Sequence, residues 1–220
     1  MLRYLTSGES HGQSLISIID GLPSNVELNF DEINAELKKR QCGYGRGGRM
    51  KIESDKVNIL GGVRGKKTLG GPVSIEVKNR DYQNWTEYMA PMDDVDFETR
   101  KVDNVRPGHA DLVGCLKYDF TDARNVLERS SARETASRVA VGAICKQLLK
   151  NFDIDFVSHV IQIGNVKDEN VYDFDYIKNN VDSSEVRCAN KDMEAKMIAQ
   201  IDEIKNERDT IGGVVEVRVK

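Results

Sequence analysis

The sequence of 220 residues is poor in the features that mark several large classes of protein. It has no CxxC pair and no histidine at metal-ligand spacing from a cysteine, so we predict reduced thiols and neither a metal site nor a disulfide framework. Its first residues lack the apolar core of a signal peptide, and no run approaches the roughly 18 apolar residues of a membrane span. We therefore expect a cytoplasmic protein with no membrane partner. The four cysteines are Cys42, Cys115, Cys145 and Cys188.

The sequence also lacks an excess of positive charge. Its net charge of -4 argues against a surface built as a whole for nucleic acid, so we expect no nucleic-acid partner and read any basic cluster as local. Internal repeats and low-complexity segments are missing as well. With 39% hydrophobic residues, a chain of this length can bury a sizeable core.

The spacing of apolar residues favours an α+β fold. Alternation with a period of two predicts strands, which we place at residues 14–19, 52–60, 73–77, 157–163 and 214–219. Asp31 can cap a helix with Ile33, Ala35 and Leu37 on its inner side; further helices are expected from Ser131 and over 193–207. Residues 79–104 are acidic and turn-prone, which is typical of a long surface excursion. The absence of regular strand-helix alternation makes a doubly wound parallel sheet unfavourable.

A glycine-flanked motif, Gly8-Glu9-Ser10-His11-Gly12, is the first candidate for chemistry. It matches the G-x-S-x-G nucleophile elbow of α/β-hydrolases, but that motif needs a strand before the serine and a helix after it. Only nine residues precede Ser10, and a strand is expected after it. A turn with an incidental histidine is the other simple interpretation.

A basic, glycine-rich segment follows the first helix. Its cations are Lys38, Lys39, Arg40, Arg46, Arg49 and Lys51. Glycine backbone and guanidinium groups can close on a phosphate, although a solvated basic turn has the same composition. A nucleic-acid loop is disfavoured by the acidic whole and by Tyr44 as the only aromatic residue nearby.

Two later segments place charged and polar groups close together. The turn Arg106-Pro107-Gly108-His109-Ala110-Asp111 offers a histidine for acid–base work, or else forms a structural corner. Residues 128–133 combine two serines and two arginines at the start of a predicted helix, where Ser131 to Glu134 read as a capping box. Two arginines at the positive end of a helix dipole favour an anion site there.

Taken in this order, the four segments resemble chorismate synthase. The matching stretches are residues 8–12 with 20–23, 40–47, 106–111, and 129–135 with 138–140, and weaker matches extend over essentially all 220 residues. The resemblance implies a carbon-oxygen lyase that converts 5-enolpyruvylshikimate 3-phosphate to chorismate by anti-1,4-elimination of phosphate. That is the last common step of the shikimate pathway for aromatic amino acids. It requires reduced FMN, and in some members NADPH reduces the flavin.

The resemblance also assigns expected roles to residues. His11 would donate a proton near the departing phosphate, and His109 would protonate or stabilise the reduced flavin. The substrate-binding residues would be Ser10, Arg40, Arg46, Arg49, Arg106 and Arg133. The FMN-binding residues would be Arg129, Ser130 and Ser131, and NADPH would be met by Arg40 and Arg46. The implied assembly is a homotetramer, and no metal is implied.

The implied fold is a β-α-β sandwich with helices between two largely antiparallel sheets, of which residues 1–220 form the N-terminal portion of a single domain. Family members continue into a second half with Lys-Pro-Thr and Arg-His-Asp-Pro stretches that this sequence lacks. The alternative is therefore a truncated, non-catalytic fragment that binds anions or oligomerises. A smaller departure is Cys42, which stands where the family often has proline or glycine.

Overall fold

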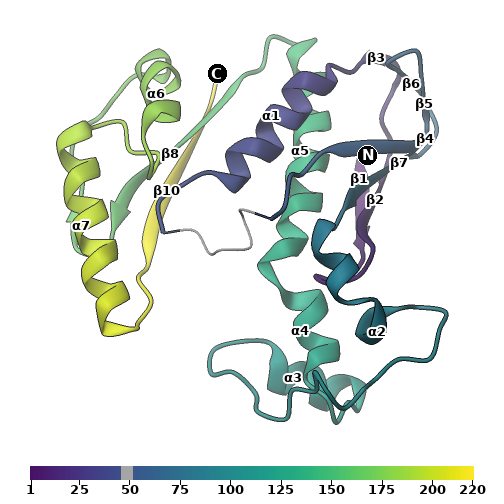
Figure 1. Cartoon of the computed structure of the whole chain (residues 1–220). Coiled ribbons are helices and arrows are strands. Elements are labelled where there is room, and N and C mark those ends of the chain that lie inside the picture. Colours follow the sequence, from purple (N-terminus) through teal and green to yellow (C-terminus); the bar gives the residue numbers. More distant parts are fainter. Residues whose placement is uncertain (46–51) are drawn as a thin grey trace. The chain divides into compact units, whose positions relative to one another are not determined.

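The computed structural model describes residues 1–45 and 52–220, which divide into two compact units (Figure 1). The first unit comprises the described residues 1–38 and 52–148, and the second comprises 39–45 and 149–220. No described helix is long and apolar enough to cross a membrane. The single domain expected over 1–220 stays a prediction.

A four-stranded antiparallel sheet forms the frame of the first unit. Its strand order is β1-β2-β7-β4, with bounds Arg3–Ser7, Ser14–Asp20, Val73–Lys78 and Val57–Gly61. A smaller sheet has the order β3-β6-β5, with bounds Ser24–Glu27, Lys67–Leu69 and Val63–Arg64. Every pairing is antiparallel. The period-two alternation explains the larger sheet, since Leu15 and Ile19 face the core together with Val73, Ile75 and Val77.

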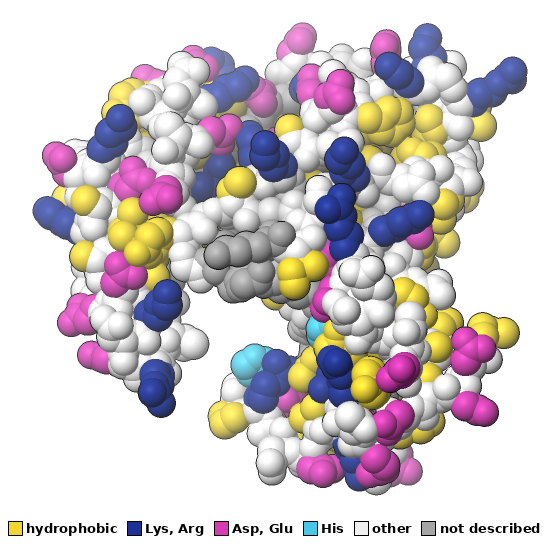
Figure 2. Space-filling view, in the orientation of Figure 1, with side chains coloured by type: hydrophobic (Ala, Val, Ile, Leu, Met, Phe, Trp, Pro, Cys, Tyr) yellow, Lys and Arg dark blue, Asp and Glu magenta, His cyan; other side chains and the backbone are white. Residues whose placement is uncertain are grey.

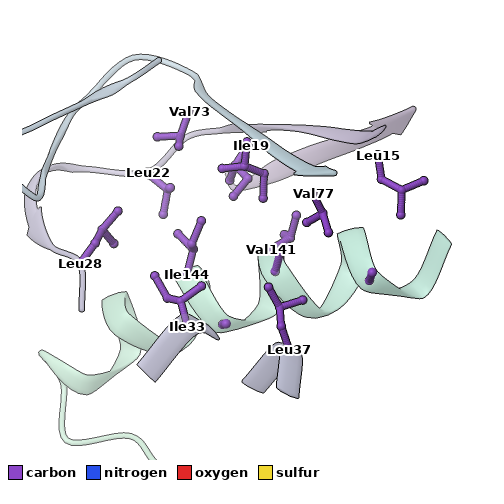
Figure 3. Close-up of a cluster of buried hydrophobic side chains, with 14 of the residues drawn as sticks. Leu15, Ile19, Leu22, Leu28, Ile33, Leu37, Val73, Val77, Val141 and Ile144 are labelled. Atoms are coloured by element: carbon purple, nitrogen blue, oxygen red, sulfur yellow. The ribbon is translucent and has the colours of Figure 1, made fainter. Parts of the chain in front are cut away.

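Helices α1 (Phe30–Gln41) and α5 (Thr135–Lys150) supply the other side of this core. Figure 3 shows Ile33 and Leu37 from α1 and Ile144 from α5 pointing toward the apolar side chains of the strands. On α5, Ala136 and Ala140 are fully buried one turn apart, so their small size lets the helix lie close to its neighbours. The predicted helix faces are therefore largely confirmed.

For helix α1, the expected capping residue and one residue of the expected inner face were wrong. Asn29, and not Asp31, caps the helix, since its Oδ1 accepts hydrogen bonds from the backbone N–H groups of Asp31 (3.1 Å) and Glu32 (3.2 Å). Ala35 is exposed. It follows Ile33 by two residues, which is about 200° around a helix, and therefore points away from the core.

Shorter helices fill the rest of the first unit. They are η2 (Arg80–Asn84), α2 (Thr86–Met89), α3 (Asp111–Tyr118), α4 (Arg124–Ser130) and η3 (Ala132–Glu134). The excursion over 79–104 contains η2 and α2 and no strand, as its composition predicted. The strand expected over 52–60 is shorter: β4 begins at Val57, and the buried carboxylates of Glu53 and Asp55 before it pair with Arg133.

Helices α3 and α4 pack together at a glycine. A methyl group on Gly114 would lie 2.4 Å from Cγ1 and 2.7 Å from Cγ2 of Val126. We expect Gly114→Ala to lower the free energy of unfolding by about 1–3 kcal/mol, because overpacking outweighs the gain in helix propensity. Urea denaturation measures the change. Gly142→Ala on α5 is the matched control, since nothing lies within 4 Å of its added methyl; equal effects of the two changes would contradict the packing argument.

The second unit is built on a three-stranded antiparallel sheet. Strand β8 (Phe156–Ile163) lies between β10 (Gly213–Val219) and β9 (Val166–Lys167). Helices α6 (Phe174–Asn180), η4 (Val181–Ser183) and α7 (Lys191–Glu207) complete the unit. Its predicted strands and helix are confirmed, and so is the α+β class, since both units combine helices with antiparallel sheets. The four cysteines form no disulfide bond.

Candidate active site

The motif loop from Gly8 to Gly12 connects β1 to β2 and is tightly constrained. Gly8 has a φ of 102°, and a Cβ there would lie 2.3 Å from the carbonyl oxygen of Ser14, so only glycine fits. The side-chain amide of Asn79 donates to the carbonyl oxygens of Glu9 (3.1 Å) and Gly12 (2.8 Å). These contacts fix the backbone that presents Ser10 and His11.

His11 is oriented by a buried carboxylate. Its Nδ1 lies 2.9 and 3.0 Å from the two carboxylate oxygens of Glu128, and its backbone N–H donates to the same group at 2.8 Å. Glu128 is 2% exposed and also accepts a hydrogen bond from Nη1 of Arg124 at 3.0 Å. Burial favours a higher pKa for Glu128, but the bonds from His11 and Arg124 prevail and hold its pKa below the ordinary value.

The indole of Trp85 stacks on the ring of His11. The ring centroids are 3.8 Å apart, with an angle of 27° between the planes. The guanidinium groups of Arg100 and Arg124 lie 3.9 and 5.2 Å from the centre of the Trp85 ring. The segment expected to be a surface excursion therefore supplies part of the His11 environment.

Ser10 lies inside the protein next to Ser131. It is 1% exposed, its Oγ donates to Oγ of Ser131 at 3.0 Å, and its backbone N–H donates to the carbonyl oxygen of Glu128 at 2.9 Å. Strand β1 precedes the motif, but strand β2 follows it, as expected, where a hydrolase elbow needs a helix. The hydrolase hypothesis therefore has no structural support.

Arg133 is buried in a network of acceptors. Its Nη1 lies 2.6 Å from Asp55, its Nε donates to Oδ1 of Asn79 at 2.7 Å, and its Nη2 lies 3.2 Å from the carbonyl oxygen of Lys78 and 3.6 Å from Glu53. Only 3% of Arg133 is exposed. Through Asn79 it supports the loop that carries His11.

The expected helix start at residues 128–133 needs correction. Glu128, Arg129 and Ser130 end helix α4, and only Ser131 acts as a cap, accepting the backbone N–H of Arg133 at 3.3 Å. Arg129 thus lies at a helix C-terminus, where a cation is favourable. Arg133 is compensated by carboxylates of the protein itself, so its position alone does not call for an external anion.

Arg129 and Ser130 face solvent beside this cap. The Nη2 of Arg129 donates to the carbonyl oxygen (2.9 Å) and Oγ1 (2.6 Å) of Thr6 and lies 3.8 Å from Glu134, yet its side chain is 43% exposed. Ser130 is exposed, and Ser131 is partly exposed. An accessible guanidinium with two neighbouring hydroxyls is a donor set suited to a phosphate.

The turn before α3 is a rigid corner that also presents His109. Arg106 donates to Asp111 from Nε (2.8 Å) and Nη2 (2.9 Å), and its backbone N–H adds a bond at 3.0 Å. His109 is exposed, with its Nδ1 3.1 Å from the carbonyl oxygen of Pro107. Both interpretations of this turn therefore stand: Asp111 anchors it, and His109 is accessible.

We expect the ion pair of Asp111 with Arg106 to make the stability of the protein depend on pH in the acid range. The side-chain hydrogen bonds from Arg106 lower the pKa of the fully buried Asp111 to about 2. Because a carboxyl pKa near 3.9 in the unfolded chain exceeds this value, the stabilisation is present above about pH 4 and is lost as the pH falls through about 2. Unfolding midpoints at pH 5, 3 and 2 measure it; an Asp111→Asn variant that loses stability over this range as steeply as the parent would contradict it.

Three further residues predicted to bind substrate or NADPH are Arg40, Arg46 and Arg49. Arg40 lies in the last turn of α1, within the second unit, and is partly exposed. Arg46 and Arg49 lie outside the described residues. On the face shown in Figure 2, side chains of both charges are interspersed.

Several residues of the site were not found from the sequence. Glu53 and Asp55 were assigned to a strand; their period-two spacing was the signal, since it puts two carboxylates on the buried face. Asn79 and Trp85 were assigned to a surface excursion, and the single tryptophan in an acidic stretch was the only hint. Glu128 was noticed only as a neighbour of Arg129.

Comparison with known proteins gives a consistent result across the chain. A sequence model of the chorismate synthase family matches residues 2–220. A chorismate synthase from Alkaliphilus metalliredigens is 54% identical over 220 residues, which are 100% of this chain and 57% of that protein. One from Staphylococcus carnosus is 52% identical over 223 residues, 100% of this chain and 58% of that protein.

A solved structure agrees. A crystal structure of chorismate synthase superposes with a TM-score of 0.76 at 38% identity, over 99% of this chain and 58% of that one. The chain therefore spans little more than half the length of the relatives that it matches.

Proposed function

Since this chain belongs to the chorismate synthase family, we propose that the whole protein is a carbon-oxygen lyase that forms chorismate from 5-enolpyruvylshikimate 3-phosphate. In this anti-1,4-elimination a ring C–H bond and the C–O bond to phosphate both break. The hydrogen is lost as a proton, its bonding electrons enter the double-bond system of the ring as a new double bond, and phosphate leaves with the electron pair of the C–O bond. The observation that carries the proposal is the fixed position of His11. Its ring is held by the buried carboxylate of Glu128, and its loop begins at Gly8, where only glycine fits.

His11 is suited to donate a proton to the departing phosphate. Because its Nδ1 faces Glu128, the donated proton comes from Nε2. The ionised Glu128 stabilises the charged imidazolium before transfer and keeps the ring in one orientation. His109, on its exposed turn, is assigned to the reduced flavin as a proton donor or stabilising group.

Reduced FMN fits the donors at the end of α4. Arg129, Ser130 and Ser131 would hold its phosphate, since an accessible guanidinium and two hydroxyls suit that group. Reduced flavin, when bound, would supply electron density to the substrate without net oxidation. NADPH, where it is used, would meet Arg40 and Arg46.

The substrate's phosphate and two carboxylates call for several cations. Ser10, Arg40, Arg46, Arg49 and Arg106 are proposed as ligands, of which Arg106 keeps 40% of its side chain exposed while paired with Asp111. Arg133 is proposed to act through the loop that it supports, because its donors face Asp55, Asn79 and Lys78. A cytoplasmic homotetramer is the assembly that we propose.

Phosphate release tests the activity directly. The whole protein, supplied with reduced FMN and 5-enolpyruvylshikimate 3-phosphate, is expected to release phosphate in proportion to chorismate formed. His109→Ala is expected to slow this release while the melting temperature stays the same. Absence of turnover by the parent protein contradicts the assignment, and an unchanged rate in the variant removes His109 from the site.

The alternative is that these 220 residues alone form a non-catalytic fragment that binds anions or oligomerises. It is motivated by their share of the relatives' length. Titration of the chain with FMN and substrate separates the two: binding of both favours a working site, and binding of neither favours the fragment.

A further inference from the structure

The ring of His11 is fixed by two different kinds of contact. The carboxylate of Glu128 meets Nδ1 at 2.9 and 3.0 Å, while Trp85 lies against the ring face with centroids 3.8 Å apart. Hydrogen bonds at one ring nitrogen set where that nitrogen points, yet they still allow the ring to tilt about the line to the carboxylate. A flat surface against the ring face opposes the tilt and so determines where Nε2 lies.

Trp85 is itself held from several sides. Its Nε1 donates to Oδ2 of Asp81 at 3.1 Å, and the ring of Tyr88 meets it edge-on at 6.3 Å. The guanidinium of Arg100 lies 3.9 Å from the Trp85 ring centre and 4.5 Å from that of Tyr88. A cation over an aromatic face is attracted by the ring quadrupole, most strongly for tryptophan.

The segment that carries Trp85 and Arg100 is hydrogen-bonded to helix α4, which carries Glu128, and to the residues just before it. The carbonyl oxygen of Arg100 accepts a hydrogen bond from Nε of Arg124, in the first turn of α4. The backbone of Val102 donates to Asp122 at 2.9 Å and accepts from Ala123 at 3.0 Å. The stack and the carboxylate are thus parts of one connected structure around α4.

We propose that Trp85 is a positioning residue for His11 and that Arg100 holds Trp85 in place. The inference rests on the proposed function, because it concerns proton delivery by His11 in the elimination. Trp85 sets the plane of the imidazole while Glu128 sets its in-plane direction, so that Nε2 is directed to one point. Arg100 acts on His11 indirectly, through its cation–π contacts with the rings of Trp85 and Tyr88.

Proton NMR of the 220-residue chain tests the stack without any activity measurement. The chain has three histidines and one tryptophan, so the ring-proton signals can be assigned with His109→Gln and His159→Gln. The ring current of Trp85 is expected to move the His11 signals upfield. That shift should disappear in Trp85→Ala and decrease in Arg100→Gln, but persist in Lys101→Gln, the matched control whose lysine pairs with two exposed carboxylates.

Turnover by the whole protein tests the positioning. Trp85→Ala is expected to lower kcat by about tenfold to a hundredfold with little change in KM, since misplacing a reacting group by about 1 Å has effects of this size. Trp85→Phe, which restores a flat face, should recover most of the rate, and Lys101→Gln should keep all of it.

The NMR measurement tests the stack of Trp85 on His11, and the turnover measurement tests the positioning role. A His11 signal that is the same in parent and Trp85→Ala overturns the stack, and a lost shift with unchanged kcat overturns the positioning role. If the parent protein shows no turnover, the proposed function fails and the positioning role fails with it, while the NMR result still decides whether Trp85 lies on His11.

Discussion

Replacing Arg133 with alanine is expected to lower the free energy of unfolding by about 3–5 kcal/mol, the usual cost of removing one partner from a buried ion pair. The Arg133 side chain is 2% exposed, and the side chains of Asp55 and Glu53, at 2.6 and 3.6 Å from its guanidinium, are fully buried. Without the arginine, these two buried carboxylates lose the guanidinium that lies beside both of them. Urea denaturation of the 220-residue chain measures the loss.

Neutralising the whole cluster separates charge from packing. The variant Arg133→Met with Glu53→Gln and Asp55→Asn removes all three charges and is expected to recover a large part of the stability lost in Arg133→Ala. Arg138→Ala is the matched control, because Arg138 pairs with Glu134 on the surface and its loss should cost less than about 1 kcal/mol. If Arg133→Ala and Arg138→Ala have equal effects, the buried network does not contribute as argued.

Local periodicity made most of the fold predictable. Strand β2 and strand β7 each alternate strictly between core and surface, and α7 carries a clear helical pattern, so neighbouring residues alone specify these elements. Predictions failed where two nearby residues satisfied the same local rule, as at the start of α1. Asn29 and Asp31 are both good capping residues, and only the fold shows which one receives the amide bonds.

The site was predictable only as a set of motifs. Ser10, His11, Arg129 and Ser131 were found by resemblance, and the structure does bring Ser10 and His11 beside the end of α4. Their partners were not found, because His11 and Glu128 are 117 residues apart and Asp55 and Arg133 are 78 apart. Contacts at such separation leave no periodic signal in one sequence.

The exchange of Glu128 for glutamine is expected to lower kcat of the whole protein by about 100-fold or more, in line with the loss of an oriented acid–base group. Glutamine keeps the volume of the side chain but replaces one acceptor oxygen by a donor NH2. Donors of His11 and Arg124 then meet another donor, the imidazolium loses its counter-charge, and the neutral ring left after proton transfer loses its fixed tautomer. Because the change acts on the chemical step, kcat and kcat/KM should fall together.

The control for this variant is Glu36→Gln, since Glu36 pairs with Lys146 at 3.2 Å on partly exposed surface. Binding of FMN should be equal in both variants, because the guanidinium of the proposed flavin donor Arg129 contacts Thr6 and Glu134 and is partly exposed. Glu128→Asp keeps the charge but shortens the reach to His11, so its rate should lie between parent and Glu128→Gln. A Glu128→Gln protein with parental kcat would mean that His11 needs no carboxylate, and proton delivery by an oriented imidazole would have to be abandoned.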